Sequence, residues 1–497
     1  MGSLTTSIVA FRDVVEIMLV VTAVLVALSS IDDLVVDLLY WGRRLTRPNA
    51  FDATADLATM EAIPQAPIAV IIPAWQEHEV IFSMLAANQA TTKYDNYHLF
   101  VGAYQNDAAT LTEVRRAEAQ SNRVHLVVVP RDGPTSKADC LNVVANGVFA
   151  FEQAKGIKFA GLVLHDAEDL IHPYELVLFN FMAHDNDFIQ LPVFSFKRPL
   201  RELVGGVYMD EFAESHLKDI PVRRMISGLV PCAGVAAFFG RDIALRTMAD
   251  NAGSLFRSDS LTEDYDFALR LGLLGARVNF VIAPASYTID ISSSTDLPEI
   301  VGRKLPIATR EFFPNSFVAA QRQRARWLMG IVFQGTRSFG WRGTTGIKYA
   351  LLRDRKSILT APLIMLAYLV LFGLVSVNLY FRWYLPDEVN RFPLLQEPLV
   401  QQLLWLNFAF LIWRLLHRFY FTNRIYGLRH GLMSIPRLPL GNFLNFFAVA
   451  RACRLYLSHS LLGTRLVWDK TEHQYPTGLH AFDLGPGTKL READSAK

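Results

Sequence analysis

The sequence predicts an α/β protein with a doubly wound, mostly parallel sheet, to which transmembrane helices are attached. Between residues 67 and 290, short apolar runs alternate with helical stretches, a pattern typical of parallel strands joined by right-handed helical crossovers. Longer apolar runs lie on both sides of this region. Hydrophobic residues make up 51% of the 497 residues and charged residues only 19%, a balance shifted toward membrane proteins. The sequence therefore indicates a soluble domain between membrane segments.

An N-terminal membrane anchor is expected over residues 1–42. Residues 14–30 are apolar except for Glu16, which is about the minimum length for a spanning helix. A cluster of arginines at 43–47 follows, and such an excess of positive charge predicts that the chain continues in the cytoplasm. A buried helix of the soluble domain is the alternative. Residues 43–66, in which Ala, Pro, Asp and Thr are frequent, are expected to form a linker.

The soluble domain is expected over residues 67–300. Its apolar runs predict buried parallel strands at 68–73, 97–104, 124–129 and 160–166, separated by helices at 79–92, 110–121 and 137–154. In doubly wound sheets the ligands bind outside the carboxyl ends of the strands. Motifs that directly follow a strand are therefore the best candidates for a functional site.

Membrane helices are expected again within residues 346–460. The apolar runs 358–381 and 399–416 are long enough to span, and the basic residues before the first and after the second predict that both outer ends lie in the cytoplasm. Polar residues are rare in these spans, so they indicate no polar conduit. The segment 431–458 also holds prolines and arginines, which favours an interfacial or re-entrant element. Residues 461–497 are expected to be a cytoplasmic tail.

Charge and cysteine content exclude two classes of function. A net charge of +2 is too small for a nucleic-acid-binding protein, which normally carries a clustered basic surface. Cys140, Cys232 and Cys453 lie far apart and match no metal-ligand or disulfide spacing. The cysteines therefore indicate a reducing compartment.

The strongest local motif is HDAEDLIHP at 165–173, where a buried-type strand ends in three carboxylates, Asp166, Glu168 and Asp169. A divalent cation that bridges two phosphates accounts for carboxylates at this place, because hard cations prefer oxygen ligands and keep substrate phosphates in their shell. The alternative is a carboxylate-rich turn that caps the next helix.

A second acidic motif, Thr262-Glu263-Asp264, opens a helical stretch. A carboxylate in this position can act as a general base on an attacking hydroxyl group. Alternatively, Thr262 caps the helix and Asp264 interacts with the helix dipole in the first turn.

The third motif is QRQRARW at 321–327, within a region of interfacial helices expected over 301–345. On a helix, Gln323 and Arg326 share one face and can reach a phosphate together, while Trp327 offers a flat surface for a sugar ring. The alternative is a basic amphipathic helix lying on lipid headgroups, which Arg322 and Arg324 would also suit.

Together the three motifs resemble the family-2 glycosyltransferases, which include cellulose, chitin and hyaluronan synthases. That family carries a D-x-D, a T-E-D and a Q-x-x-R-W motif in this order between membrane segments. Smaller matches are PAWQE at 73–77, SKADCLN at 136–142 and VPCAGVAAFFGRD at 230–242. The resemblance covers roughly residues 65–340 and implies a nucleotide-sugar-binding domain of the GT-A type.

The resemblance also implies a role for individual residues. Asp264 and Glu263 would be catalytic, and Asp166 and Glu168 would hold Mg²⁺ or Mn²⁺ on the donor diphosphate. The nucleotide sugar would be bound by a larger set, namely Pro73, Glu77, Asp107, Lys137, Asp166, Gln323, Arg326 and Trp327. The acceptor would be bound by Cys232, Gly234 and Trp327.

This chain departs from the family pattern at two places. The Asp-Asp pair that follows the second strand in most members reads Asn106-Asp107 here, and the D-x-D motif reads Asp-Ala-Glu. The first departure bears on recognition of the uracil base of a UDP-sugar.

The implied function is inverting transfer of a hexosyl or N-acetylhexosaminyl group from a nucleotide-diphosphate sugar, expected to be a UDP-sugar, to a growing polysaccharide. The enzyme would be a multi-pass protein of the bacterial inner membrane with a cytoplasmic catalytic domain, and periplasmic or outer-membrane partners would serve export. Two alternatives stay open. One is transfer of a single sugar to a lipid-linked acceptor, and the other is a non-catalytic phage-receptor or scaffold component that retains the fold.

Overall fold

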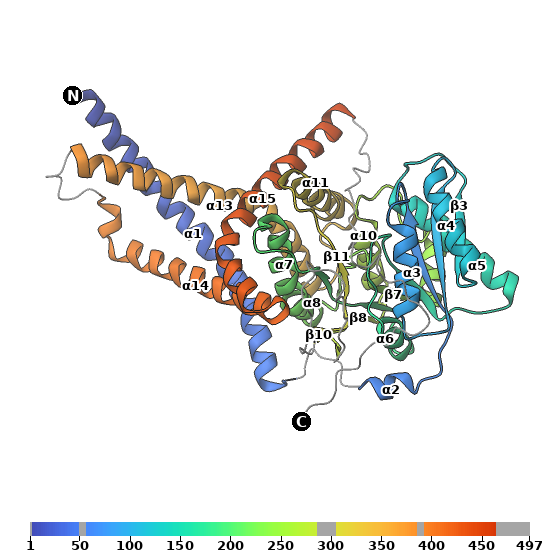
Figure 1. The fold of residues 1–497 in the computed structure, drawn as a ribbon. Helices are drawn as coiled ribbons and strands as arrows, with labels where there is room; N and C mark the ends of the chain where they lie inside the picture. Colours follow the sequence, from blue (N-terminus) through green and yellow to red (C-terminus); the bar gives the residue numbers. More distant parts are fainter. Residues whose placement is uncertain (1, 49–55, 286–304, 385–391, 464–497) are drawn as a thin grey trace.

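The computed structural model describes residues 2–48, 56–285, 305–384 and 392–463. It places an α/β domain beside long helices that extend away from it (Figure 1). The shorter helices α7 (Leu203–Glu214), α8 (Ile220–Ser227) and α11 (Phe317–Leu328) lie between these two parts.

The α/β domain is built on a seven-stranded sheet with the order β3-β2-β1-β4-β7-β5-β8. β7 runs antiparallel to β4 and β5, and all other neighbours in this sheet are parallel. The strands are β1 (Ile68–Ala74), β2 (Tyr97–Tyr104), β3 (Val124–Val129), β4 (Gly161–Leu164), β5 (Phe188–Gln190), β7 (Ala237–Gly240) and β8 (Val278–Phe280). The predicted fold class, a mostly parallel doubly wound sheet, is confirmed.

Helices cover both faces of this sheet, which explains why its central strand is apolar throughout. In β1, Ala69 and Ile71 belong to one core cluster, whereas Ile68, Val70 and Ile72 belong to the other, and all five are fully buried. A strand covered on both faces has no polar side. The surrounding helices are α2 (Leu57–Glu61), α3 (Ile81–Thr91), α4 (Ala108–Gln120), α5 (Lys137–Lys155), α6 (Glu175–Met182), α9 (Arg241–Asp250) and α10 (Glu263–Leu273).

Two small sheets and several short turns complete the connections. β6 (Val193–Ser195) pairs with β11 (Thr309–Glu311), and β9 (Pro284–Ala285) pairs with β10 (Leu305–Pro306). The short helical turns are η1 (Ser215–Asp219), η2 (Met329–Gln334), α12 (Gly335–Phe339) and η3 (Leu394–Gln396).

Within the described residues, three long helices are apolar enough to cross a membrane, namely α1 (Gly2–Thr46), α13 (Thr345–Tyr384) and α14 (Pro398–Tyr426). They contain the three spans expected from the sequence. Large apolar side chains on their outer sides, such as Leu369 and Trp405, are exposed, which suits contact with lipid. α1 continues to Thr46, beyond the predicted end of the anchor.

The segment 431–458, for which the sequence left an interfacial or a re-entrant element open, belongs to one continuous helix, α15 (Leu428–Leu462). Pro436 and Pro439 lie inside this helix without ending it. α15 packs against α7, α11, α13 and α14. It therefore links the membrane helices to the helix that bears the third motif.

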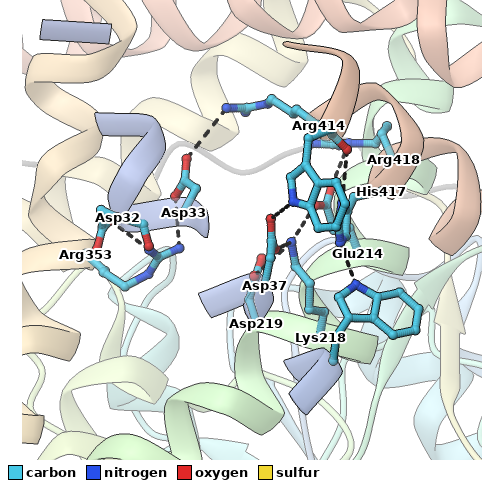
Figure 2. A network of polar contacts seen from close by, with 12 residues as sticks. Asp32, Asp33, Asp37, Glu214, Lys218, Asp219, Arg353, Arg414, His417 and Arg418 are labelled. Atoms are coloured by element: carbon cyan, nitrogen blue, oxygen red, sulfur yellow. Dashed lines mark hydrogen bonds and ion pairs between the residues drawn. The ribbon is translucent and has the colours of Figure 1, made fainter. Parts of the chain in front are cut away.

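Ion pairs join α1 and α14 to the helices of the α/β domain (Figure 2). The ammonium group of Lys218 in η1 lies 2.6 Å from Asp37 of α1 and 2.8 Å from Glu214 of α7. Glu214 also pairs with Arg418 of α14 at 2.8 Å, and the Trp413 indole donates a hydrogen bond to Asp37. Lys218 thus compensates the charge of carboxylates from two separate parts of the chain.

We expect replacement of Lys218 by Met to lower the free energy of unfolding by about 3 kcal/mol or more, because it leaves the buried Asp37 carboxylate without its cation and takes one of two cations from Glu214. Lys158→Met is the control, since Lys158 is exposed on the α/β domain. Thermal unfolding of the detergent-solubilised protein measures both. Equal melting temperatures for the two variants would contradict this account of the network.

Candidate active site

The first two sequence motifs meet at the carboxyl edge of the sheet. Asp166 follows the end of β4, and Lys137 is the first residue of α5, the helix that follows β3. The Lys137 ammonium group lies 2.6 Å from a carboxylate oxygen of Asp166. Asp264 lies near the same point, because it and Lys137 both approach Gly234. A Cβ atom built on Gly234 would lie 2.8 Å from Oδ2 of Asp264 and 3.8 Å from Nζ of Lys137.

Lys137 is a cation surrounded by carboxylates. Burial acts to lower its pKa, but the negative charges of Asp166, Glu263 and Asp264 outweigh burial and raise the pKa above its usual value. Lys137 therefore stays protonated and partly neutralises three acidic groups at this edge of the sheet.

Glu263 and Asp264 occupy the first turn of α10. Burial raises the pKa of both carboxyl groups, and their mutual repulsion raises the pKa of Glu263 further, to about 7, while Lys137 and Arg326 oppose the shift. The backbone N–H of Tyr265 donates a hydrogen bond of 2.8 Å to Asp264. The alternative role of Thr262 as a capping side chain is wrong, since its hydroxyl makes no capping hydrogen bond. The Thr262 side chain instead packs against Gly330, in the space that a Cβ atom on this glycine would occupy.

The raised pKa of Glu263 predicts how stability depends on pH. A carboxyl group whose pKa is raised by folding stabilises the fold below its unfolded value, about 4.5, and this contribution is lost as the pH rises through about 7. The Glu263→Gln variant does not lose this stability, because the glutamine side chain does not titrate. We therefore expect the metal-free variant to gain several degrees in melting temperature relative to the unchanged chain between pH 4.5 and 8. A difference that does not change with pH would contradict the shift.

Asp169 belongs to the framework of the site. Its Oδ2 atom accepts hydrogen bonds from the backbone N–H of Asp166, at 2.9 Å, and from His165, at 2.8 Å. The other ring nitrogen of His165 lies 2.6 Å from Glu175. Burial lowers the pKa of His165, but these two carboxylates outweigh it and raise the pKa to about 10. His165 is therefore an imidazolium that fixes the turn after β4.

The carboxylates of Asp166 and Glu168 remain as the candidate metal ligands. They do not cap the next helix, α6, whose N-cap residue is Tyr174. Among the described residues no group of three or more metal-binding side chains is present. Two carboxylates fit a hard cation that completes its shell with diphosphate oxygens.

The side chains of Asn106 and Asp107, which follow β2, form hydrogen bonds within the protein. Asp107 caps α4 through a hydrogen bond from Thr110 and accepts a second one, of 2.6 Å, from the backbone of Gln76. Asn106 exchanges two hydrogen bonds with the backbone of Gly133. Both residues therefore shape the loops at this edge, and their side chains are engaged within the protein.

Two further predicted donor residues lie in β1 and just after it. Pro73 is buried within the strand, and Glu77 follows it with 6% of its surface exposed. The backbone N–H of Glu77 donates a hydrogen bond to Thr110. The structure therefore places both residues beside the loop that Asp107 holds.

The third motif lies on α11, as predicted. The positive charge of Arg326 lowers the pKa of Glu263 and Asp264, which places its guanidinium group near both. The headgroup alternative is only partly compatible with the structure. Arg322 is exposed, but Arg324 is buried and pairs with Glu211 at 2.7 Å.

A cavity of about 400 Å³ begins at Asp264 and reaches the long helices. Cys232 and Trp327 line it together with Asp264, and so do Val36 of α1 and Asp354 of α13. Burial raises the pKa of the Cys232 thiol, so it stays neutral. The predicted acceptor residues Cys232, Gly234 and Trp327 are thus brought together beside Asp264.

The cavity carries more negative than positive charge. It is lined by three carboxylates, Asp219, Asp264 and Asp354, and by two guanidinium groups, Arg223 and Arg353. Burial lowers the pKa of His216, which also lines it, to about 4, so this imidazole is neutral. Both guanidinium groups are already paired, Arg223 with Asp354 and Arg353 with Asp32.

Sequence reasoning missed several of these groups. Arg353 lies in a basic run that predicts membrane orientation, and no short motif marks Asp354 as part of a cavity. Asp354 accepts a hydrogen bond of 2.5 Å from the hydroxyl of Tyr265, the residue after Asp264. The only available signal was a single carboxylate within a basic run that precedes an apolar span.

Comparison with known proteins identifies the family of this chain. A family model described as glycosyltransferase like family 2 matches residues 64–330. The chain is 38% identical over 466 residues to bacteriophage adsorption protein B of Escherichia coli K12 and, at the same identity, to bacteriophage N4 adsorption protein B of E. coli O157:H7. The alignment covers 93% of this chain and 62% of each relative, so the chain spans less than two thirds of their length.

Solved structures with similar folds are more distant. A mannosyltransferase from Pyrobaculum calidifontis, solved with GDP-Man and Mn²⁺, is 15% identical, with a TM-score of 0.45 over 86% of this chain and 99% of that chain. Glucosyl-3-phosphoglycerate synthase from Mycobacterium tuberculosis is 14% identical, with a TM-score of 0.25 over 41% of this chain and 74% of that chain. Because the family model matches more than half of its residues, this chain belongs to the family-2 glycosyltransferases.

Proposed function

We propose that this protein is an inverting glycosyltransferase that moves a sugar from a nucleotide-diphosphate donor to a hydroxyl group of a saccharide acceptor at the bacterial inner membrane. One observation carries the proposal. Asp264 lies between the Lys137–Asp166 ion pair on one side and the cavity that leads to the long helices on the other. A group in this position can reach a donor and an acceptor at once.

The donor side holds the residues suited to a diphosphate. Asp166 and Glu168 are the ligands for Mg²⁺ or Mn²⁺, which neutralises charge on the leaving diphosphate. Lys137 and Arg326 bring two positive charges to the same place. Gln323 and Trp327 lie beside Arg326 on α11 and orient the donor. The donor is proposed to be a UDP-sugar, and a GDP-sugar is tested beside it because Asn106 stands where most family members have an aspartate.

Asp264 is the proposed general base. It accepts the proton of the attacking hydroxyl group while that oxygen forms a bond to the anomeric carbon and the bond to the diphosphate breaks. Burial raises its pKa, which makes the carboxylate a stronger base, while Lys137 and Arg326 oppose this shift. Glu263 lies beside it in the first turn of α10 and is proposed to take part in catalysis, with a pKa that burial raises to about 7.

The charge of the cavity favours a saccharide acceptor over a lipid phosphate. A phosphate acceptor requires uncompensated cations, whereas here the carboxylates outnumber the guanidinium groups and both guanidinium groups are paired. Neutral hydroxyl groups can bond to both kinds of side chain. The single-transfer alternative with a lipid phosphate is therefore the weaker one.

The space beyond Asp264 is large enough for an extended acceptor. A second cavity, of about 300 Å³, shares Ser215, Asp219 and Arg353 with the first. Polymer synthesis is therefore the proposed form of the reaction, with the catalytic domain on the cytoplasmic side and the three long helices crossing the membrane. Export is proposed to need a partner protein.

The test is release of nucleoside diphosphate by the detergent-purified full chain, measured with Mn²⁺ over a panel of nucleotide sugars. Neutral oligosaccharides and a polyprenyl phosphate are added in parallel as acceptors. Turnover with one donor that only oligosaccharides stimulate supports the proposal. Stimulation by the polyprenyl phosphate alone would favour transfer to lipid, and nucleotide binding without any turnover would favour a receptor or scaffold.

A further inference from the structure

The proline-containing segment 436–446 of α15 has no role in the chemistry proposed above, yet its side chains reach three other helices. Arg437 pairs with Asp210 of α7 at 2.8 Å, and Asn442 donates a hydrogen bond of 2.7 Å to the hydroxyl of Tyr368 in α13. Asn445 accepts a hydrogen bond of 2.6 Å from Arg324 of α11. Figure 1 shows α15 running beside α7 and α11.

Arg324 is the residue through which α15 holds α11. Its buried guanidinium group bonds to Asn445, pairs with Glu211 of α7 at 2.7 Å, and lies 4.5 Å above the ring of Tyr208. A second contact runs in parallel, because the Gln321 amide donates a hydrogen bond of 3.0 Å to the Phe447 carbonyl. Two contacts one turn apart prevent α11 from rotating or sliding along α15.

The same helix carries the proposed donor-binding residues. Arg324 lies between Gln323 and Arg326 in the chain, and each residue turns the helix by about 100°. A rotation of α11 that released Arg324 would therefore move Arg326 and Trp327 by the same angle. The position of the Arg326 charge beside Glu263 and Asp264 depends on this rotation being fixed.

We propose that Asn445, acting through Arg324, is a positioning residue that sets the rotation of α11 so that Arg326 and Trp327 reach the donor diphosphate. This inference rests on the proposed function of the site. Asn445 touches neither donor nor acceptor. Its effect is to hold the guanidinium group of Arg324 through the same Nη1 atom that pairs with Glu211, and thereby to fix the helix between α7 and α15.

The experiment measures equilibrium binding of UDP, and of GDP in parallel, each with Mn²⁺, to the detergent-purified full chain. Asn445→Ala is compared with Asn442→Ala, which removes one hydrogen bond from the same helix at a similarly half-buried position but faces α13. We expect Asn445→Ala to weaken binding of the nucleotide that the unchanged chain prefers by about fivefold to tenfold, the equivalent of about one hydrogen bond. Asn442→Ala leaves the affinity unchanged.

Asn445→Asp keeps an acceptor for Arg324 and restores the affinity. Equal affinities for Asn445→Ala and Asn442→Ala would overturn the inference. So would a fall in melting temperature for Asn445→Ala well beyond that of Asn442→Ala, because it would assign Asn445 a purely structural role. If the unchanged chain binds neither nucleotide, the proposed function fails as well, and this outcome is distinct from equal binding by all variants.

Discussion

Replacement of Asp264 by Asn is expected to lower the rate of sugar transfer by about a thousandfold, in the range that a general base contributes. An amide of the same shape cannot accept the proton of the attacking hydroxyl group. Donor binding should change little, because the proposed metal ligands Asp166 and Glu168 and the cation Lys137 remain. Single-turnover transfer and nucleoside-diphosphate binding, both with Mn²⁺, measure the two effects separately.

Asp266→Asn is the control for this variant. Asp266 lies two residues along α10, but it pairs with Arg270 at 2.9 Å and does not line the cavity that begins at Asp264. It should retain most of the transfer rate. A comparable loss of activity in both variants would show that acidic residues of α10 matter only for the fold, and it would remove Asp264 from the mechanism.

Gly234→Ala is expected to reduce transfer by about a hundredfold, because a misplacement of reacting groups by about 1 Å can cost that much. Gly234 has a φ of +83°, where a side chain is strained, and the added Cβ would lie 2.8 Å from the Asp264 carboxylate. The carboxylate must move away from both Lys137 and the acceptor. Transfer rates and melting temperature distinguish loss of activity from loss of structure.

Gly253 offers a matched control for backbone strain. Its φ of +82° is nearly the same, but a Cβ added there meets nothing within 4 Å. Gly253→Ala should therefore show the cost of the backbone conformation alone, about 1 to 2 kcal/mol of stability, and no loss of transfer. If Gly234→Ala transferred sugar as fast as Gly253→Ala, the close approach of Gly234 to Asp264 would have no catalytic meaning.

The sequence predicted those residues of the candidate site that follow a strand or open a helix. Lys137, Asp166 and Asp264 lie far apart in the sequence, and the structure brings them to one edge of the sheet. Their roles stay predictions that the variants above test. Only the placement of the loops shows that the Asp107 carboxylate caps α4 and holds Gln76, because no local pattern in the sequence indicates this contact.

The sequence by itself determined the sheet and the long apolar helices. β2 and β3 begin and end at the predicted residues, because each is a continuous, mainly apolar run between polar segments. β2 is buried along nearly its whole length, whereas the edge strand β3 is partly exposed. The apolar runs near both ends likewise identify the three long helices, since only about twenty consecutive apolar residues can span a membrane.

Only the tertiary structure decided which charged residues meet. Arg353 and Asp32 are 321 residues apart, yet they form an ion pair, and Arg353 lines the cavity that begins at Asp264. Arg324, which resembled a headgroup contact, is buried against Glu211 and Asn445. Spacing along a helix shows which face a charge occupies, but its partner depends on how distant helices pack, and no local pattern encodes that packing.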